Sequence, residues 1–222
     1  MTDAPRPGSR EVILGRIRRA LADVPAAERP RDVPVDRGYL RTHGDLTPDQ
    51  RVGLLAVNLA DYRAVVHRCP AGEVPAVVAA LLEARGSRTV VVPSGVPEGW
   101  TAVARRRMDV VGDDPHLTPH QLDLVDSVLT GCAVAVAETG TLVLDASPDQ
   151  GRRAITLVPD HHVCVVRAPE QVVASVPEAL ERLVPSRPLT WISGPSATSD
   201  IELDRVEGVH GPRVLEVVLA EG

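Results

Sequence analysis

The stretch EVPAVVAALLEARGSRTVVV, residues 73–92, carries the pattern that decides the fold. Its first part predicts a helix that ends at Gly86, because glycine readily adopts the left-handed conformation that follows many helices. Its last part, RTVVV at 88–92, predicts a short buried strand made of β-branched residues. A helix that leads directly into an apolar strand is the repeating unit of a parallel sheet covered by helices.

The same alternation of helices and strands extends along most of the chain. We expect a helix from Thr47, which is placed to cap it, with Pro48 in its first turn. A second Thr-Pro-x-Gln start predicts a helix over 118–131, and Pro177 is expected to kink or break a helix over 169–184. Residues 97–107 are weakly helical. Further strands are expected at 63–67, 108–111, 162–167, 189–193 and 214–220. These elements predict an α/β fold with a mostly parallel sheet flanked by helices.

The segment 132–160 predicts a different arrangement. Two apolar runs there are joined only by Glu138-Thr139-Gly140, which is too short for a helical crossover. We therefore expect adjacent strands joined by a tight turn, with a further strand at 152–159. The segment would then form an antiparallel insertion in the fold.

The start of the chain is predicted to be separate from the main body. Residues 9–22 predict an amphipathic helix capped by Ser9, with Ile13, Ile17 and Leu21 on one face. A Pro- and Arg-rich arm follows at 25–38. We therefore divide the chain into an N-terminal helix and arm, residues 1–44, and a main domain, residues 45–222.

Composition excludes several classes of function. All 24 basic residues are arginine, which rules out a lysine Schiff base and the lysine of a Walker phosphate loop. A net charge of -6 and an aromatic content of 2% oppose nucleic-acid binding. The three cysteines lack metal or cluster spacing, so we expect no intrinsic cofactor and no metal. There is no apolar run of membrane-spanning length and no signal peptide, so we expect a cytoplasmic protein without membrane contact.

Small and polar residues cluster where the predicted strands begin or end. Ligands of open α/β sheets bind beyond the carboxyl ends of the strands, and we expect the ETGT, DHH and GPSATSD stretches to meet there. A small anion would bind among these turns, with Arg152 or Arg153 pairing its carboxylate. The candidate catalytic residues, as base, acid, nucleophile or proton carrier, are Glu138, His210 and Asp200. The candidate substrate-binding residues are Thr139, Gly140, Thr141, Arg152, His162, Gly194, Pro195, Ser196, Thr198 and Gly211.

Four blocks carry a resemblance to a known family: AETGTLVL at 137–144, LVPDHHVCVV at 157–166, ISGPSATSDIE at 192–202 and GVHGP at 208–212. In this order they resemble the LUD domain of the lactate utilization protein C (LutC) family, over roughly residues 45–220. The resemblance implies a fold similar to the ribose-phosphate isomerase, glucosamine-phosphate deaminase and CoA-transferase group (NagB/RpiA/CoA-transferase-like). It also implies a cluster-free component of an L-lactate utilization system. Such a component would support oxidation of L-lactate to pyruvate beside iron–sulfur partner proteins (LutA-like and LutB-like).

Two other functions stay open at this point. CoA-transferases of that fold group use a glutamate before a Gly-rich turn, and Glu138 has a similar setting. A CoA-transferase-like or ligase-like enzyme acting on a small carboxylic acid or a phosphorylated metabolite is therefore an alternative. The turn reads Glu-Thr-Gly where those enzymes have Glu-Asn-Gly, which counts against a covalent acyl role. The third reading is a non-catalytic assembly or regulatory subunit that docks a partner through the N-terminal helix.

Overall fold

The structure, a computed structural model, describes residues 8–25, 27, 29, 34–36, 38–113, 117–195, 197–198, 206–207 and 211–222. The chain divides into two compact units, residues 1–39 and residues 40–222. Within the described parts, no helix combines the length and the apolar character needed to cross a bilayer.

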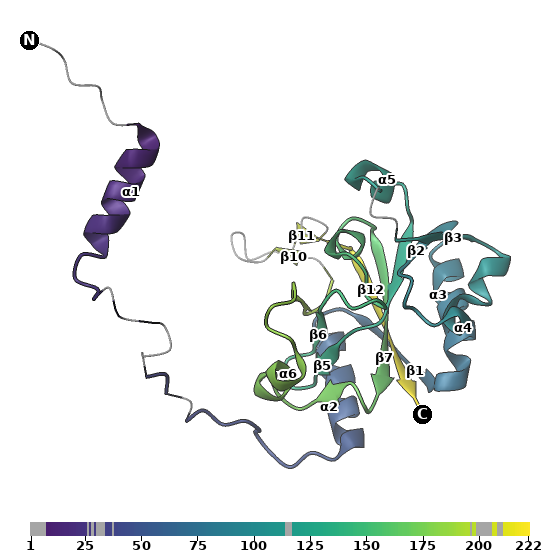
Figure 1. The fold of residues 1–222 in the computed structure, drawn as a ribbon. Helices are drawn as coiled ribbons and strands as arrows, with labels where there is room; N and C mark the ends of the chain where they lie inside the picture. Colours follow the sequence, from purple (N-terminus) through teal and green to yellow (C-terminus); the bar gives the residue numbers. More distant parts are fainter. Residues whose placement is uncertain are drawn as a thin grey trace, which may run out of the picture. The chain divides into compact units, whose positions relative to one another are not determined.

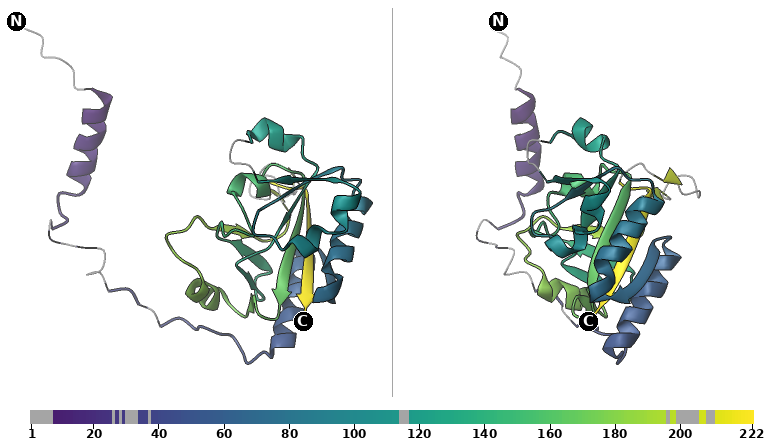
Figure 2. Two further views of the ribbon diagram at one scale, coloured as in Figure 1. Left: turned by 45° about the vertical axis from the view of Figure 1, so that its right-hand side comes forward. Right: turned by 90° about the vertical axis from the view of Figure 1, so that its right-hand side faces the viewer.

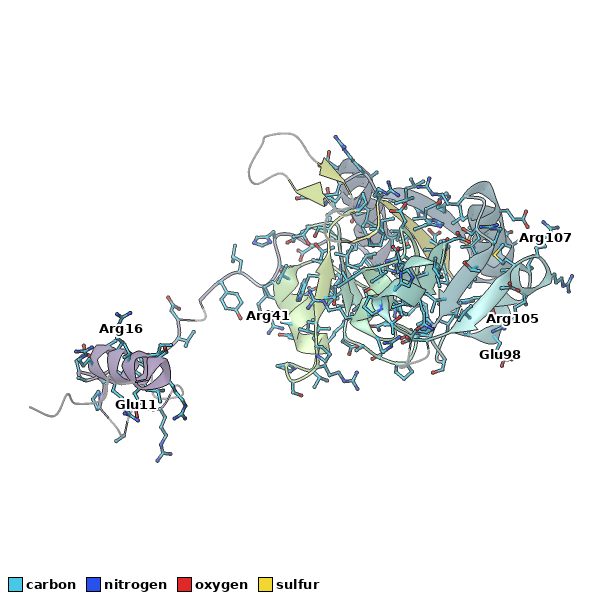
Figure 3. The ribbon with its side chains drawn as sticks, turned by 90° about the horizontal axis from the view of Figure 1, so that it is seen from above. Glu11, Arg16, Arg41, Glu98, Arg105 and Arg107 are labelled. Carbon is cyan, nitrogen blue, oxygen red and sulfur yellow. The ribbon has the colours of Figure 1, made fainter. Side chains whose placement is uncertain are left out.

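The described part of the first unit contains one helix, α1 (Ser9–Ala20). Its N-cap is Gly8 rather than Ser9, and the Gly8 N–H donates to the Glu11 carboxylate at 3.1 Å. The twelve residues of α1 include no buried side chain, and Ile13 and Ile17 on the predicted apolar face are exposed. Glu11 and Arg16 project from opposite sides of this helix (Figure 3).

The second unit is built on a six-stranded, entirely parallel sheet in the order β1-β12-β7-β4-β2-β3 (Figure 1). The strands are β1 (Val65–Pro70), β2 (Thr89–Val92), β3 (Asp109–Gly112), β4 (Ser127–Thr130), β7 (His161–Ala168) and β12 (Val214–Glu221). The predicted α/β fold with a mostly parallel sheet is confirmed.

Helices and a second sheet cover the two faces of this sheet (Figure 2). On one face, α3 (Val74–Ala84), α4 (Glu98–Thr101) and η3 (Ala104–Arg106) lie over the sheet, and Val78 and Leu82 pack with Val163 and Val218. On the other face, Leu55 and Leu59 of α2 (Pro48–Asp61) pack with Cys164 and Val217. The cores on both faces consist of Val, Leu, Ile and Ala, with a few Cys and Met.

The predicted antiparallel insertion is confirmed and forms a sheet of its own, in the order β8-β5-β6-β9. Its strands are β5 (Val134–Val136), β6 (Thr141–Leu144), β8 (Val172–Val173) and β9 (Thr190–Ile192). Its inner face packs on α2 and the large sheet, and its outer face packs on Ala179 of α6 (Val176–Arg182) and on Leu183. A short hairpin pairs β10 (Ala197–Thr198) with β11 (Val206–Glu207).

Local signals set the ends of α2 and α3 as predicted. The Thr47 hydroxyl accepts from the Gln50 N–H at 3.3 Å, and the Gln50 side chain accepts from the Thr47 N–H at 2.9 Å. Gly86 follows α3 with a φ of 73°, the left-handed conformation that glycine adopts without strain.

Three predicted elements are wrong. The helix expected over 118–131 is only α5 (Pro119–Asp123), and β4 follows it. The helix stops early because the Asp126 carboxylate accepts hydrogen bonds from the N–H groups of Arg88 and Thr89, at 2.8 and 2.9 Å. These bonds tie the segment to β2. The strand expected at 152–159 is a single 3-10 turn, η4 (Arg153–Thr156). The helix expected over 169–184 is β8 followed by α6, in which Pro177 lies in the first turn, where its missing N–H costs nothing.

The loop of residues 145–152, which follows β6, occupies the carboxyl ends of the large sheet. Gly95, just beyond β2, and Gly131, directly after β4, donate their N–H groups to the Pro148 and Asp149 carbonyls, each at 2.9 Å. A Cβ atom at Gly95 would lie 2.5 Å from Pro148, so only glycine admits this approach. Arg167 near the end of β7 also binds Asp149, at 3.0 Å. We call residues 145–152 the edge loop.

Candidate functional site

A cavity of about 280 Å³ opens at the amino ends of β7 and β12, beside the end of β9. Its lining combines the guanidinium of Arg153 and the imidazole of His162 with hydroxyl and apolar groups. The lining residues are Arg153, Thr156, Leu157, His162, Thr190, Trp191, Ile192, Ser193, Gly194, Pro195, Gly211, Pro212 and Leu215. None of these described lining residues is acidic, so the cavity wall suits an anion.

The cavity lies at the opposite edge of the sheet from the one we predicted. His161 and His162 of the DHH stretch begin β7, and Gly211 precedes β12, so both lie at the amino edge. The edge loop explains the difference, because its backbone fills the space beyond the carboxyl ends of β2 and β4.

The two Gly-containing turns that the sequence singled out meet over the end of α2. β6 and β9 pair antiparallel with Leu142 opposite Ile192, and this register continued by one residue sets Thr141 opposite Ser193. The Thr141 and Ser193 hydroxyl oxygens are 2.8 Å apart, and the Thr139 hydroxyl lies 2.8 Å from that of Thr141. The ETGT turn therefore adjoins the cavity through Ser193.

Close packing explains both glycines. Gly140 has a φ of 55°, and a Cβ atom there would lie 2.7 Å from the Asn58 carbonyl carbon. Gly194 has a φ of 82°, and a Cβ atom there would lie 2.2 Å from the Tyr62 carbonyl oxygen. Asn58 also donates to the Ala137 carbonyl at 2.7 Å, which holds the turn on the helix.

His162 is a buried polar side chain of the cavity lining, with 1% of its surface exposed. Its Nε2 atom lies 2.8 Å from the hydroxyl oxygen of Thr130, which is fully buried. Burial, with a smaller contribution from the neighbouring His161, lowers the pKa of His162 to about 3. The imidazole is therefore neutral at physiological pH.

The two candidate arginines have different surroundings. Arg152 pairs with Asp113, with 2.8 Å between Nε and Oδ1, and does not line the cavity. Arg153 lines the cavity, and no carboxylate among the described residues pairs with it. Of the two alternatives for a carboxylate partner, Arg153 is the one placed at the cavity.

Glu138 does not line the cavity. Its Oε2 atom lies 2.9 Å from Nδ1 of His43, which belongs to the segment before α2. That segment is held against α6 by the hydroxyl of the N-cap residue Ser175, which donates to the Arg41 carbonyl, and by an ion pair between Arg41 and Glu181. No sequence pattern pointed to His43, because it lies in a polar stretch without periodicity.

The structure therefore gathers only part of the predicted site. It places His162, Gly194, Pro195 and Gly211 on the cavity and sets the Thr139–Thr141 turn beside it. Arg152 and Glu138 lie away from the cavity wall. Ser196, Asp200 and His210 lie outside the described residues, and of Thr198 only the backbone is described, in β10. Leu157, Trp191 and Ser193 were not among the predicted site residues, although Ser193 directly precedes the Gly194 turn.

In the described part of the chain, no group of three or more His, Cys, Asp or Glu side chains is arranged so that it could hold a metal ion. Cys69, Cys132 and Cys164 are free thiols and are buried in the core.

Comparisons with known proteins agree on one family. The family model described as the LUD domain matches residues 58–220. Lactate utilization protein C of Deinococcus radiodurans is 52% identical over 165 residues, which cover 72% of this chain and 75% of the relative. Lactate utilization protein C of Bacillus subtilis is 36% identical over 93 residues, which cover 38% of each chain. The crystal structure of a DUF162 family protein from Deinococcus radiodurans matches with a TM-score of 0.68 and 42% identity, covering 80% of this chain and 100% of that one.

Proposed function

Because the chain belongs to the LUD domain family, we propose that it acts in lactate utilization as a component without iron–sulfur clusters of its own. The names of its relatives support this role. In the proposed reaction the cavity binds L-lactate or pyruvate, and partner proteins that carry iron–sulfur clusters accept the electrons.

One observation carries the proposal: Arg153 faces a small cavity that has no acidic residue in its described wall. A guanidinium offers parallel N–H donors that match a carboxylate. A volume of about 280 Å³ lies at the small end of ligand pockets and suits a three-carbon acid.

The chemistry assigned to this chain is limited to binding and orientation. Oxidation of a 2-hydroxy acid to a 2-oxo acid removes two electrons and two protons from the substrate. The proposal sends the two electrons to the iron–sulfur partners and the two protons to solvent. The burial of all three cysteines in the core supports placing the clusters on those partners. Glu138, bonded to His43 and away from the cavity, gives no support to a covalent acyl intermediate.

Calorimetry with L-lactate and pyruvate tests the substrate site, both on the isolated chain and on the chain assembled with its partners. Arg153→Ala is expected to weaken binding of both acids by roughly 10- to 100-fold, because it removes a charge-assisted hydrogen-bond pair. Arg152→Ala is the matched control and should bind as the wild type does, since Arg152 pairs with Asp113. Absence of binding in both states, or equal losses in the two variants, would contradict the proposal.

The partner claim has its own experiment. The tagged chain, expressed in cells grown on lactate, is expected to co-purify with proteins that contain iron and acid-labile sulfide. If the captured proteins contain neither iron nor acid-labile sulfide, the claim of iron–sulfur partners is wrong. The substrate site is then decided by the calorimetry alone.

A non-catalytic assembly role is the second candidate, and the exposed apolar face of α1 favours it. Ile13, Ile17 and Leu21 are all exposed, so this face is available to a partner. Deletion of residues 1–39 is expected to abolish co-purification while circular dichroism of the remaining unit stays unchanged. Capture that survives the deletion would count against docking through α1.

A further inference from the structure

We propose that Thr130 fixes His162 as a neutral N–H donor, so that the cavity selects carboxylates that carry a second oxygen next to the carboxyl group. His162 would contact the ligand, and Thr130, which does not line the cavity, would be a positioning residue. This inference rests on the proposed function, because it takes the ligand to be a small carboxylate.

Hydrogen-bond accounting assigns the direction of the Thr130–His162 bond. The two atoms are 2.8 Å apart, and each belongs to a buried side chain. If His162 donated from Nε2, the Thr130 hydroxyl hydrogen would need another acceptor, and the described residues supply none. A buried hydroxyl hydrogen without an acceptor is unfavourable, because the hydroxyl loses its hydrogen bond to water without gaining another. The Thr130 hydroxyl therefore donates to Nε2, and the single proton of the neutral ring lies on Nδ1.

The Nδ1 atom of His162 is open to the cavity. No hydrogen-bond partner is found for it among the described residues. In the described structure, one buried side-chain atom lacks a hydrogen-bond partner, and it is Nε2 of His161. Because Nδ1 of His162 also lacks a partner but does not belong to this class, it is not fully buried. Nδ1 is therefore not sealed from solvent, and the side chain that carries it lines the cavity. A ligand in the cavity meets an N–H donor at this point.

Two groups then share the recognition of the ligand. Arg153 supplies the positive charge for the carboxylate, whereas His162 stays uncharged because burial lowers its pKa to about 3. A neutral N–H is satisfied by a carbonyl or hydroxyl oxygen. L-lactate and pyruvate carry such an oxygen on the carbon next to the carboxylate, and propionate does not. A ligand without it leaves the donor unpaired, which weakens the binding of that ligand.

Nuclear magnetic resonance of the protein labelled with ¹⁵N-histidine tests the tautomer without any ligand. The wild type and Thr130→Ser are expected to show the His162 proton on Nδ1, and Thr130→Val should shift it to Nε2 or to a mixture. Ser127→Ala is the matched control, because Ser127 is the other buried β4 hydroxyl that bonds a β7 histidine, at 2.8 Å from His161. An Nε2 proton on His162 in the wild type, or in Thr130→Ser, would overturn the inference.

Calorimetry then tests the selectivity. The wild type, Thr130→Ser and Ser127→Ala are expected to bind pyruvate roughly fivefold to tenfold more tightly than propionate, and in Thr130→Val this ratio should fall to about one. Equal wild-type affinities for pyruvate and propionate, both sensitive to Arg153→Ala, would overturn the inference and leave the proposed function in place. Absence of binding by either acid would overturn both. A Thr130→Val protein that fails to fold would leave the decision to the wild type and Thr130→Ser.

Discussion

His161 and His162 are neighbours at the start of β7, yet they face opposite sides of the sheet and have opposite surroundings. Each is bonded at 2.8 Å to a hydroxyl of β4, His161 to Ser127 and His162 to Thr130. The remaining nitrogen of His161 lies 3.3 Å from the Glu216 carboxylate, is sealed from solvent and has no hydrogen-bond partner among the described residues. The remaining nitrogen of His162 faces a cavity. Alternation along a strand thus separates a structural histidine from a ligand-binding candidate.

The His161 side belongs to a line of polar side chains that we call the polar row: Ser87, Ser127, His161, Glu216 and His67. The Ser87 and Ser127 hydroxyl oxygens are 2.6 Å apart, and His67 Nε2 lies 2.7 Å from Glu216 Oε2. Burial would raise the pKa of Glu216, but the imidazoles of His161 and His67 outweigh it and hold the pKa below its usual value. The polar row joins strands β1, β12, β7 and β4, so its role is stability.

The largest expected effect comes from breaking the polar row at its centre. Glu216→Ala removes the acceptor for His67 and the charge that faces the buried His161, and we expect a loss of about 3 kcal/mol in the free energy of unfolding. Urea denaturation at pH 7 measures it. Glu221→Ala on the same strand is the control and should lose less than about 1 kcal/mol, because its partner Arg68 is half exposed. Equal losses in the two variants would contradict a central role for the polar row.

The second-largest effect is on the pH dependence of stability. His162 has a pKa of about 3 in the folded protein and 6.5 without the fold, so between these values the unfolded chain binds the extra proton. The free energy of unfolding therefore keeps its full value above pH 6.5. It falls as the pH drops below that, by about 2 kcal/mol at pH 5. His162→Gln should remove this part of the pH dependence, and exposed His120→Gln should keep it. Urea midpoints at pH 5, 6 and 7 decide, and identical profiles for wild type and His162→Gln would refute the buried neutral state.

The smallest effect comes from the end of the polar row. Ser87→Ala removes one neutral hydrogen bond to Ser127, and we expect a loss of about 1 kcal/mol. Pyruvate affinity should not change, because the polar row and the cavity lie on opposite faces of the sheet. A weaker pyruvate affinity in this variant would show that the two faces are coupled.

Local signals in the sequence predicted the parts of the fold that depend on local contacts. Thr47 caps α2 and Gly86 follows α3 because caps act over three or four residues. The predicted helix over 118–131 failed because β4 is decided by pairing with β2 and β7, which lie far away in the sequence. The 3-10 turn of η4 was read as a strand because short apolar runs do not distinguish the two.

The sequence predicted which turns lie next to each other at the candidate site, but not the edge of the sheet at which the site lies. The ETGT and GPS turns are adjacent, as expected, because the register of β6 and β9 brings Thr141 to Ser193. The site was predicted at the wrong edge of the sheet, because the edge loop fills the space beyond the carboxyl ends of the strands. The contacts of this loop with Gly95 and Gly131 join distant residues and produce no local sequence pattern. The contact of Glu138 with His43 joins residues too distant in the sequence for any spacing rule.

The position of β12 has a consequence for biosynthesis. This last strand lies between β1 and β7, so Val65 finds its neighbour Glu216 only after nearly all of the main unit has been translated. Until then the nascent chain holds β1 apart from the other strands, and the flanks of β1 and β7 stay unpaired. Such unsatisfied flanks promote aggregation, and contacts between distant residues slow folding. Production of this protein should therefore respond to chaperones that bind ribosome-attached chains.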